Sequence, residues 1–286
     1  MNIDRIIKQA LKEDIDKGDI TTEGIFKNNF FIEAILICKS GGVLCGIDIL
    51  KRVFLILSSN FSFYFNFKDG DYISKNTIVG KIKGPIKELL IGERTALNFL
   101  QHLSGIATET RKITSKTKIK IYDTRKTTPN LRVLEKYAVK IGGGENHRFG
   151  LYDMVLIKDN HIKGIMVKEK IDKISAIKLA IERVKKYAKR KYKIEIEVEN
   201  YEEALVALNE GVDIIMFDNA KIDDIKNFCE LKNKKNCEIE VSGNIDIKKL
   251  KKFENLKIDR ISVGYITHSA KAVDFSLKIK KLVNEY

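Results

Sequence analysis

Basic side chains are concentrated between Asp123 and His161, in the sequence DTRKTTPNLRVLEKYAVKIGGGENHRFGLYDMVLIKDNH. They stand among glycines and apolar runs, where a surface that only had to be soluble would not need so many cationic donors. Guanidinium, imidazole and ammonium groups gathered in this way predict a site for a strongly anionic ligand. His147 taken alone would be a structural histidine with satisfied hydrogen bonds, so its assignment rests on its neighbours. The candidate ligand-binding residues are Arg125, Lys126, His147, Arg148 and Lys158.

Some of these cations directly follow expected strands. Residues 118–122 alternate polar and apolar side chains and stop at a turn-forming segment, so Arg125 and Lys126 are expected just past the carboxyl end of a strand. Residues 153–157 form an apolar run typical of a buried strand, and Lys158 follows it. Two successive strand ends therefore present cations.

Acidic residues, hydroxyls and glycines follow the later strands in the same way. In parallel α/β barrels the active site lies at the carboxyl ends of the strands, so these residues are expected to share one rim with the cations. Cations would form one arc of that rim, carboxylates a second, and glycine-containing loops a third. The rim residues outside the cationic stretch are Glu197, Glu199, Asp218, Ser242, Gly243 and Gly264.

Strand-like and helix-like segments alternate after residue 118, which predicts a parallel sheet with right-handed crossovers and suits a barrel. About six strands are expected, fewer than the eight of a complete barrel. Asn200 and Glu203 fit a capping box at one helix start, and Gly211 lies just past the end of that helix. The segment 163–170 is expected to be a loop, and no role is assigned to it. The strands are expected near residues 119, 154, 194, 212, 239 and 261, and the helices over 131–141, 171–188, 201–209, 222–231 and 247–253.

The first hundred residues are expected to be mainly β. A short amphipathic helix at 3–11 is followed by a turn-rich segment at 14–22. The segment 68–84 resembles the hairpin of a lipoyl-type carrier domain, but it has no suitably presented lysine, so a structural hairpin is the preferred interpretation. An apolar helix that includes Arg94 is expected over 88–107. The strands are expected at 31–38, 61–67 and 78–82.

Composition narrows the class of protein. The chain of 286 residues is long enough for one large or two modest domains, and its formal net charge is +14. That charge raises the competing hypothesis of a basic nucleic-acid-binding protein, but the lysine clusters mostly lack interleaved aromatic residues and fit solvated faces. No signal-peptide pattern or stretch of transmembrane length is present. The four cysteines form no C-x-x-C pair, which indicates reduced thiols in a cytoplasmic protein with neither a zinc site nor a disulfide framework. Neither nucleic acid nor a membrane is expected as a partner.

Ordered motifs along the chain resemble one family. DTRKTTP, GGGENHR and LIKDNH stand at 123–129, 142–148 and 156–161. They are preceded by EDIDKGDITT and GERTALNFLQHLSGIAT, and followed by EIEVEN, MFDN, EVSGNI and ISVGYITHS. In this order and spacing they resemble the quinolinate phosphoribosyltransferases, a family of type II phosphoribosyltransferases. The resemblance covers essentially the whole chain.

The resemblance implies an α/β fold, an incomplete α/β barrel with an N-terminal open-faced α+β sandwich domain. The sandwich would comprise residues 1–108 and be completed by a C-terminal helix at 269–286. The barrel, residues 109–268, would carry the active site. A homodimer is also implied, because Arg94 matches an arginine that the family supplies from the neighbouring subunit.

The resemblance also implies an enzyme, a pentosyltransferase of NAD biosynthesis. Its members transfer the phosphoribosyl group of phosphoribosyl pyrophosphate to quinolinate, releasing pyrophosphate and CO₂ and giving nicotinate mononucleotide. Lys126, Lys158, Glu197 and Asp218 match catalytic residues, and the two acids match ligands of Mg²⁺, which prefers oxygen donors. The residues that match the quinolinate site are Arg94, Arg125, Lys126, His147, Arg148 and Lys158, and those that match the phosphoribosyl pyrophosphate site are Glu197, Asp218, Ser242, Gly243, Gly264 and His268.

Two related proteins would share the scaffold, a non-carboxylating phosphoribosyltransferase and a molybdenum-associated paralogue. All six residues that match the quinolinate site are present together in this sequence. Their joint presence favours the quinolinate enzyme over both alternatives.

Overall fold

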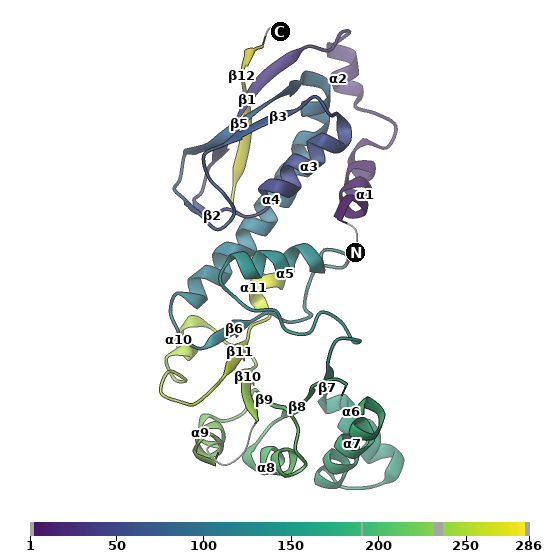
Figure 1. Ribbon diagram of the computed structural model, residues 1–286, viewed down its shortest axis with the longest axis vertical. Helices are drawn as coiled ribbons and strands as arrows, with labels where there is room; N and C mark the ends of the chain where they lie inside the picture. Colours follow the sequence, from purple (N-terminus) through teal and green to yellow (C-terminus); the bar gives the residue numbers. More distant parts are fainter. Residues whose placement is uncertain (1–2, 190, 232–236, 284–286) are drawn as a thin grey trace. The chain divides into compact units, whose positions relative to one another are not determined.

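The computed structural model describes residues 3–189, 191–231 and 237–283. The chain forms two compact units (Figure 1). The first comprises Met1–Lys112, Thr127–Gly143 and Tyr265–Tyr286, and the second Ile113–Lys126 and Gly144–Gly264. Residues 127–143 are thus grouped with the first unit, whereas the sequence predicted one continuous barrel domain over 109–268. That division into domains stays a prediction.

The first unit is built on a four-stranded antiparallel sheet in the order β12-β1-β5-β3. β1 lies inside this sheet and pairs with β5 on one side and with β12 on the other. A separate two-stranded pair joins β2 to β4. The strands are β1 (Phe31–Cys38), β2 (Gly42–Val43), β3 (Ser62–Phe65), β4 (Tyr72–Ile73), β5 (Thr77–Pro85) and β12 (Phe275–Leu282).

Two helices, α3 and α4, run alongside this sheet (Figure 1). They pack closely, because a Cβ atom at Gly92 of α4 would lie 2.8 Å from Leu57 and 3.1 Å from Phe54 of α3. Arg94 follows two residues later, exposed on α4. The helices of the first unit are α1 (Ile3–Ile15), α2 (Ile20–Ile25), α3 (Ile47–Leu57), α4 (Ile86–Thr114), α5 (Arg132–Ile141) and α11 (Tyr265–His268).

A six-stranded parallel sheet forms the second unit, in the order β6-β11-β10-β9-β8-β7. The edge strands are β6 and β7, which do not pair with each other in this order, and such an open parallel sheet is the arrangement of an incomplete barrel. At the β6 edge, Glu145 forms a parallel bridge with Tyr122. The predicted α/β class and the count of six strands are confirmed. The strands are β6 (Lys120–Tyr122), β7 (Val155–Ile157), β8 (Ile194–Val198), β9 (Ile214–Asp218), β10 (Glu238–Ser242) and β11 (Arg260–Ser262).

The two faces of this sheet differ in polarity, because successive side chains of a strand point to opposite faces. On β9, Phe217 packs against Phe228 of α9 with ring centroids 5.4 Å apart, so this face meets the helices. Met216 and Asp218 point to the other face. The sequence IEIEV of β8 follows the same alternation, which places its two glutamates on the face away from the helices. The helices are α6 (Asp159–Glu169), α7 (Lys173–Ala188), α8 (Tyr201–Asn209), α9 (Ile222–Leu231) and α10 (Ile247–Leu250).

The predicted C-terminal helix at 269–286 is wrong, because Phe275–Leu282 is strand β12. Residues Phe275, Leu277 and Ile279 alternate with polar residues, which is the period of a strand. β12 pairs with β1 from Ile32 opposite Leu282 to Cys38 opposite Phe275. The backbone groups at this edge of β1 therefore find their partners in a distant segment of the chain.

Other expectations need smaller corrections. The segment 163–170 lies mostly in helix α6, the turn-rich segment 14–22 contains the start of α2, and the expected hairpin at 68–84 is divided between β4 and β5, which belong to different sheets. The predicted N-cap is confirmed, since the Asn200 side chain accepts the Glu203 N–H at 3.0 Å. The Glu203 carboxylate accepts the backbone N–H of Glu199 and the side-chain amide of Asn200, both at 3.0 Å.

Candidate active site

A pocket of about 490 Å³ opens at the carboxyl ends of the parallel strands of the second unit. Its lining mixes apolar side chains with polar ones and carries both signs of charge. Most of the residues that the sequence singled out are brought together here: Arg125, Lys126, His147, Arg148, Lys158, Glu197, Asp218 and Ser242.

Cations line the pocket on both sides of the break in the barrel. Arg125 and Lys126 follow β6, Lys158 follows β7, and Arg148 lies on the segment between these strands. Arg148 is 8% exposed, and its guanidinium donates to the Met154 carbonyl at 3.0 Å. Burial lowers the pKa of Arg148, and the neighbouring Arg125 lowers it further. Two guanidinium groups held this close provide a binding site for a ligand with more than one negative charge.

Carboxylates occupy the next strands, β8 and β9. Glu197 forms an ion pair with Lys158, and Asp218 ends the neighbouring strand. Burial raises the pKa of Glu197 and nearby Asp218 and Asp159 act in the same sense, whereas Lys158 lowers it. A second cation placed beside these acids would offset both the burial and the repulsion.

Hydroxyl groups and a glycine-containing loop form the third side of the pocket, at the ends of β10 and β11. Ser242 and Ser262, the last residues of these strands, both line the pocket. Gly243 has a φ of +98°, and a Cβ atom there would lie 2.4 Å from the Asn219 side chain. Only glycine therefore fits this turn without displacing Asn219.

The three predicted arcs thus follow the strand order, with cations at β6 and β7, acids at β8 and β9, and hydroxyls at β10 and β11. Gly264 lies two residues past the end of β11. Arg94 and His268 belong to the first unit, where Arg94 is exposed on α4 and His268 ends α11.

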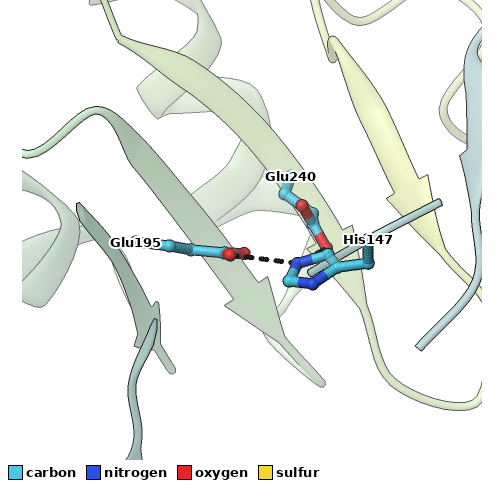
Figure 2. A group of neighbouring side chains, drawn as sticks. All are labelled: His147, Glu195 and Glu240. Atoms are coloured by element: carbon cyan, nitrogen blue, oxygen red, sulfur yellow. Dashed lines mark ion pairs between the residues drawn. The ribbon is translucent and has the colours of Figure 1, made fainter. Parts of the chain in front are cut away.

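Several residues at the pocket were not predicted. Lys173, the first residue of α7, lies 2.6 Å from both Glu199 and Glu203 and adds a cation to the lining. Its position at a helix start carried no sequence signal. Glu195 and Glu240 lie next to His147 (Figure 2). The alternation of β8 and β10 places them on the same face as Glu197 and Ser242, and this signal could have identified them.

His147 and the four cysteines are buried. His147 is buried and accepts the Arg148 N–H at Nδ1. The four cysteines are buried free thiols, and burial raises the pKa of Cys45 and Cys38. Among the helices of the described residues, none is both long and apolar enough to cross a membrane.

Comparison with known proteins identifies relatives over nearly the whole chain. Residues 19–104 match the N-terminal domain and residues 106–278 the C-terminal domain of the quinolinate phosphoribosyl transferase family. A Bacillus subtilis protein named probable nicotinate-nucleotide pyrophosphorylase (carboxylating) is 40% identical, over 98% of this chain and 94% of its own. A Methanocaldococcus jannaschii protein of the same name is 41% identical, over 96% of both chains. The crystal structure of nicotinate-nucleotide pyrophosphorylase from Ehrlichia chaffeensis has a TM-score of 0.89 and 40% identity, covering 98% of this chain and 99% of its own.

Proposed function

The chain belongs to the quinolinate phosphoribosyl transferase family, and on that premise we propose how its pocket performs the family's reaction. The enzyme transfers the phosphoribosyl group of phosphoribosyl pyrophosphate to quinolinate with decarboxylation, a step of NAD biosynthesis. The observation that carries the assignment of the site is the pocket itself, in which guanidinium and ammonium groups face a pair of carboxylates on neighbouring strands.

Quinolinate would bind at the cationic sector. Its two adjacent carboxylates need paired charge-assisted donors, and Arg125, Arg148 and Lys158 offer them in one pocket. Lys126, exposed at the pocket beside Arg125, would reach both the acid and the phosphates. The cations must hold the dianion without neutralising the 2-carboxylate so well that it cannot leave.

Phosphoribosyl pyrophosphate would bind across the acidic and hydroxyl sectors. Glu197 and Asp218 would hold the ribose hydroxyls and a Mg²⁺ ion, which takes oxygen ligands and keeps several waters. The residues fit such an ion, because Glu197 is partly buried and lies close enough to Asp218 for the two charges to repel. The ion would offset charge on the departing pyrophosphate. Ser242, Gly243 and Gly264 would donate to the 5′-phosphate, and His268 would lie near the pyrophosphate.

Two bonds change in the transfer step. The pyridine nitrogen attacks the anomeric carbon of the ribose while the carbon–oxygen bond to pyrophosphate breaks. The nearby carboxylates favour a cationic ribosyl centre, and Lys126 and Lys158 favour the leaving anion. The bond between C2 of the ring and its carboxylate then breaks and CO₂ leaves. The electron pair remains on C2, beside the new pyridinium nitrogen that stabilises it, until C2 takes a proton. No covalent enzyme intermediate is required.

The working molecule would be a homodimer. Arg94 is exposed on α4 of the first unit, and we assign it to the quinolinate site of the neighbouring subunit. Arg94 would thereby add a guanidinium to the cations that bind the two carboxylates of quinolinate.

A product assay tests the proposal. Purified protein is mixed with quinolinate, phosphoribosyl pyrophosphate and Mg²⁺, and nicotinate mononucleotide and CO₂ are followed together. Equal amounts of both products are expected. Nicotinate replaces quinolinate in the control, where no product is expected because the second carboxylate is missing. Folded dimeric protein that makes no product from either acid would contradict the proposal.

A further inference from the structure

Asn219 directly follows β9, whose last residue Asp218 lines the pocket. The backbone of Asn219 is left-handed, with a φ of +52°. The neighbouring strand β10 is followed by Gly243 and Asn244, whose φ values are +98° and +46°. Residues other than glycine seldom adopt this conformation, and where several do so together the surrounding contacts must hold them, often at a functional site. The reaction described above assigns no role to Asn219.

Asn219 joins the ends of the two strands through its backbone and its side chain. Asp218 and Ser242 lie opposite each other in the parallel register of β9 and β10. One residue further on, the Asn219 N–H donates to the Ser242 carbonyl at 3.1 Å. The side-chain carbonyl of Asn219 accepts the amide of Asn244 at 3.4 Å. The pairing of the two strands thus continues into the loops that follow them.

The Asn219 side chain also lies directly against Gly243. A Cβ atom on Gly243 would lie 2.4 Å from both Cγ and Oδ1 of Asn219, and 2.7 Å from its backbone nitrogen. The loop after β10 therefore approaches the Asn219 amide as closely as only a glycine allows. The same loop is held further along, where the Lys249 ammonium donates to the Asn244 carbonyl at 2.7 Å. Asn219 thus limits where Gly243 can lie.

Asn219 stands between the residues assigned to two parts of phosphoribosyl pyrophosphate. Asp218 is assigned to the ribose hydroxyls, and Ser242 and Gly243 to the 5′-phosphate. The ribose ring joins these two groups, so the two subsites must keep a matching spacing to bind both at once. We propose that Asn219 is a positioning residue for phosphoribosyl pyrophosphate, whose side chain holds the Gly243 loop in register with Asp218. This inference rests on the proposed function for the identity of the ligand.

Two substitutions at Asn219 separate the side chain from the backbone. Asn219→Gly keeps the left-handed conformation and removes the amide, whereas Asn219→Ala removes the amide and also disfavours the conformation. The KM for phosphoribosyl pyrophosphate is expected to rise about tenfold in Asn219→Gly, and at least as much in Asn219→Ala. The KM for quinolinate should change less than about twofold, because the cations assigned to it follow other strands. An unchanged phosphoribosyl pyrophosphate KM in Asn219→Gly, or an equal rise in both KM values, would refute the positioning role.

Asn76 provides the matched control. It is also an exposed asparagine with a left-handed backbone, at a φ of +65°, and it directly precedes β5 in the first unit. Its N–H donates to the Cys38 carbonyl at 2.7 Å, so its backbone also ties two segments together. Asn76→Gly is expected to leave both KM values unchanged. A rise in the phosphoribosyl pyrophosphate KM of Asn76→Gly that matched that of Asn219→Gly would contradict the inference.

A double substitution tests the packing without any ligand. Gly243→Ala is expected to lower the Tm of the otherwise unaltered protein by about 2–4 °C or more. The same substitution should lower the Tm less in Asn219→Gly, because the two contacts at 2.4 Å are removed and the one with the backbone nitrogen remains. Equal losses in the two backgrounds would overturn the inference. Failure of the unaltered protein to turn over quinolinate, with this coupling in Tm present, would count against the proposed function instead.

Discussion

At the scale of single residues, Glu197 and the proposed substrate compete for the Lys158 ammonium group. It pairs with Glu197 in this structure, yet the proposed site needs it for a carboxylate of quinolinate. Glu197→Gln should release Lys158, so quinolinate is expected to bind about threefold to tenfold more tightly, as suits a half-exposed ion pair. Turnover should fall at the same time, because Glu197 is also assigned to the ribose and Mg²⁺. Calorimetric titration with quinolinate and steady-state assays measure the two effects.

Glu199→Gln is the matched control for that experiment. Glu199 also lines the pocket, but it pairs with Lys173. Its neutralisation removes the same charge from the pocket and leaves Lys158 paired. Equal tightening in the two variants would show a general charge effect and would argue against competition for Lys158.

Glu240 makes a prediction about stability and pH. Its pKa is raised in the folded protein, so the folded state keeps a proton that the unfolded chain loses above about pH 4.3. The stability linked to this group is complete below the unfolded pKa and is lost as the pH rises toward the folded pKa. Glu240→Gln mimics the protonated form and should remove this dependence, up to about 1.4 kcal/mol per pH unit. Urea titrations at several pH values measure the free energy of unfolding of both proteins. If that free energy changed with pH in the same way in both, the prediction for Glu240 would be wrong.

Residue types and spacing predicted much of the pocket but not the layer beneath it. Arg125, Lys158 and Glu197 stand at strand ends, where the position of an active site in a barrel is known in advance. Glu195 and Glu240 lie further back in strands, where charged residues are seldom fully buried, and the alternation that places them on the pocket face does not show that both lie beside His147. Their closeness to His147 became visible only when the sheet brought β8, β10 and the His147 segment together.

At the scale of elements, local periodicity predicted every strand of the parallel sheet. Each of those strands is followed by a helix of its own or ends at a turn, so the pattern lies within a short stretch of sequence. β12 differs, because its partner β1 lies near the other end of the chain. No pattern within residues 275–282 predicts that pairing. The helix at 269–286 was expected from the resemblance alone, whereas the alternation of Phe275, Leu277 and Ile279 with polar residues has the period of the strand that forms.

The loop after β10 is predicted to bind the 5′-phosphate, and a substitution at Gly243 tests this. Gly243 has a positive φ and no room for a Cβ beside Asn219, so Gly243→Ala should displace the loop that is assigned to the 5′-phosphate. The KM for phosphoribosyl pyrophosphate is expected to rise about tenfold, while quinolinate affinity changes little. Gly164 of α6 has open space around its Cβ position, and Gly164→Ala should instead stabilise the protein by about 0.5–1 kcal/mol. An unchanged phosphoribosyl pyrophosphate KM in Gly243→Ala would remove this loop from the site.

At the scale of the whole molecule, the pocket and its proposed extra arginine belong to different units. The residues that line the pocket all lie in the second unit, whereas Arg94 lies in the first. If Arg94 serves the neighbouring subunit, each active site is built from two chains. A two-fold dimer then has two such sites, each with one pocket and one borrowed Arg94.

Mixing two inactive variants tests this arrangement. Lys158→Ala disables the pocket of its own chain, and Arg94→Ala disables the pocket of its partner. In a mixed dimer both defects fall on one site, and the other site is intact. Random reassociation gives half mixed dimers, so about one quarter of the wild-type activity is expected to return. A mixture of Lys158→Ala with Arg125→Ala should stay inactive, because each site of the mixed dimer then carries one defect. No recovery in the first mixture, with mixed dimers confirmed by mass spectrometry, would show that Arg94 does not act across the interface.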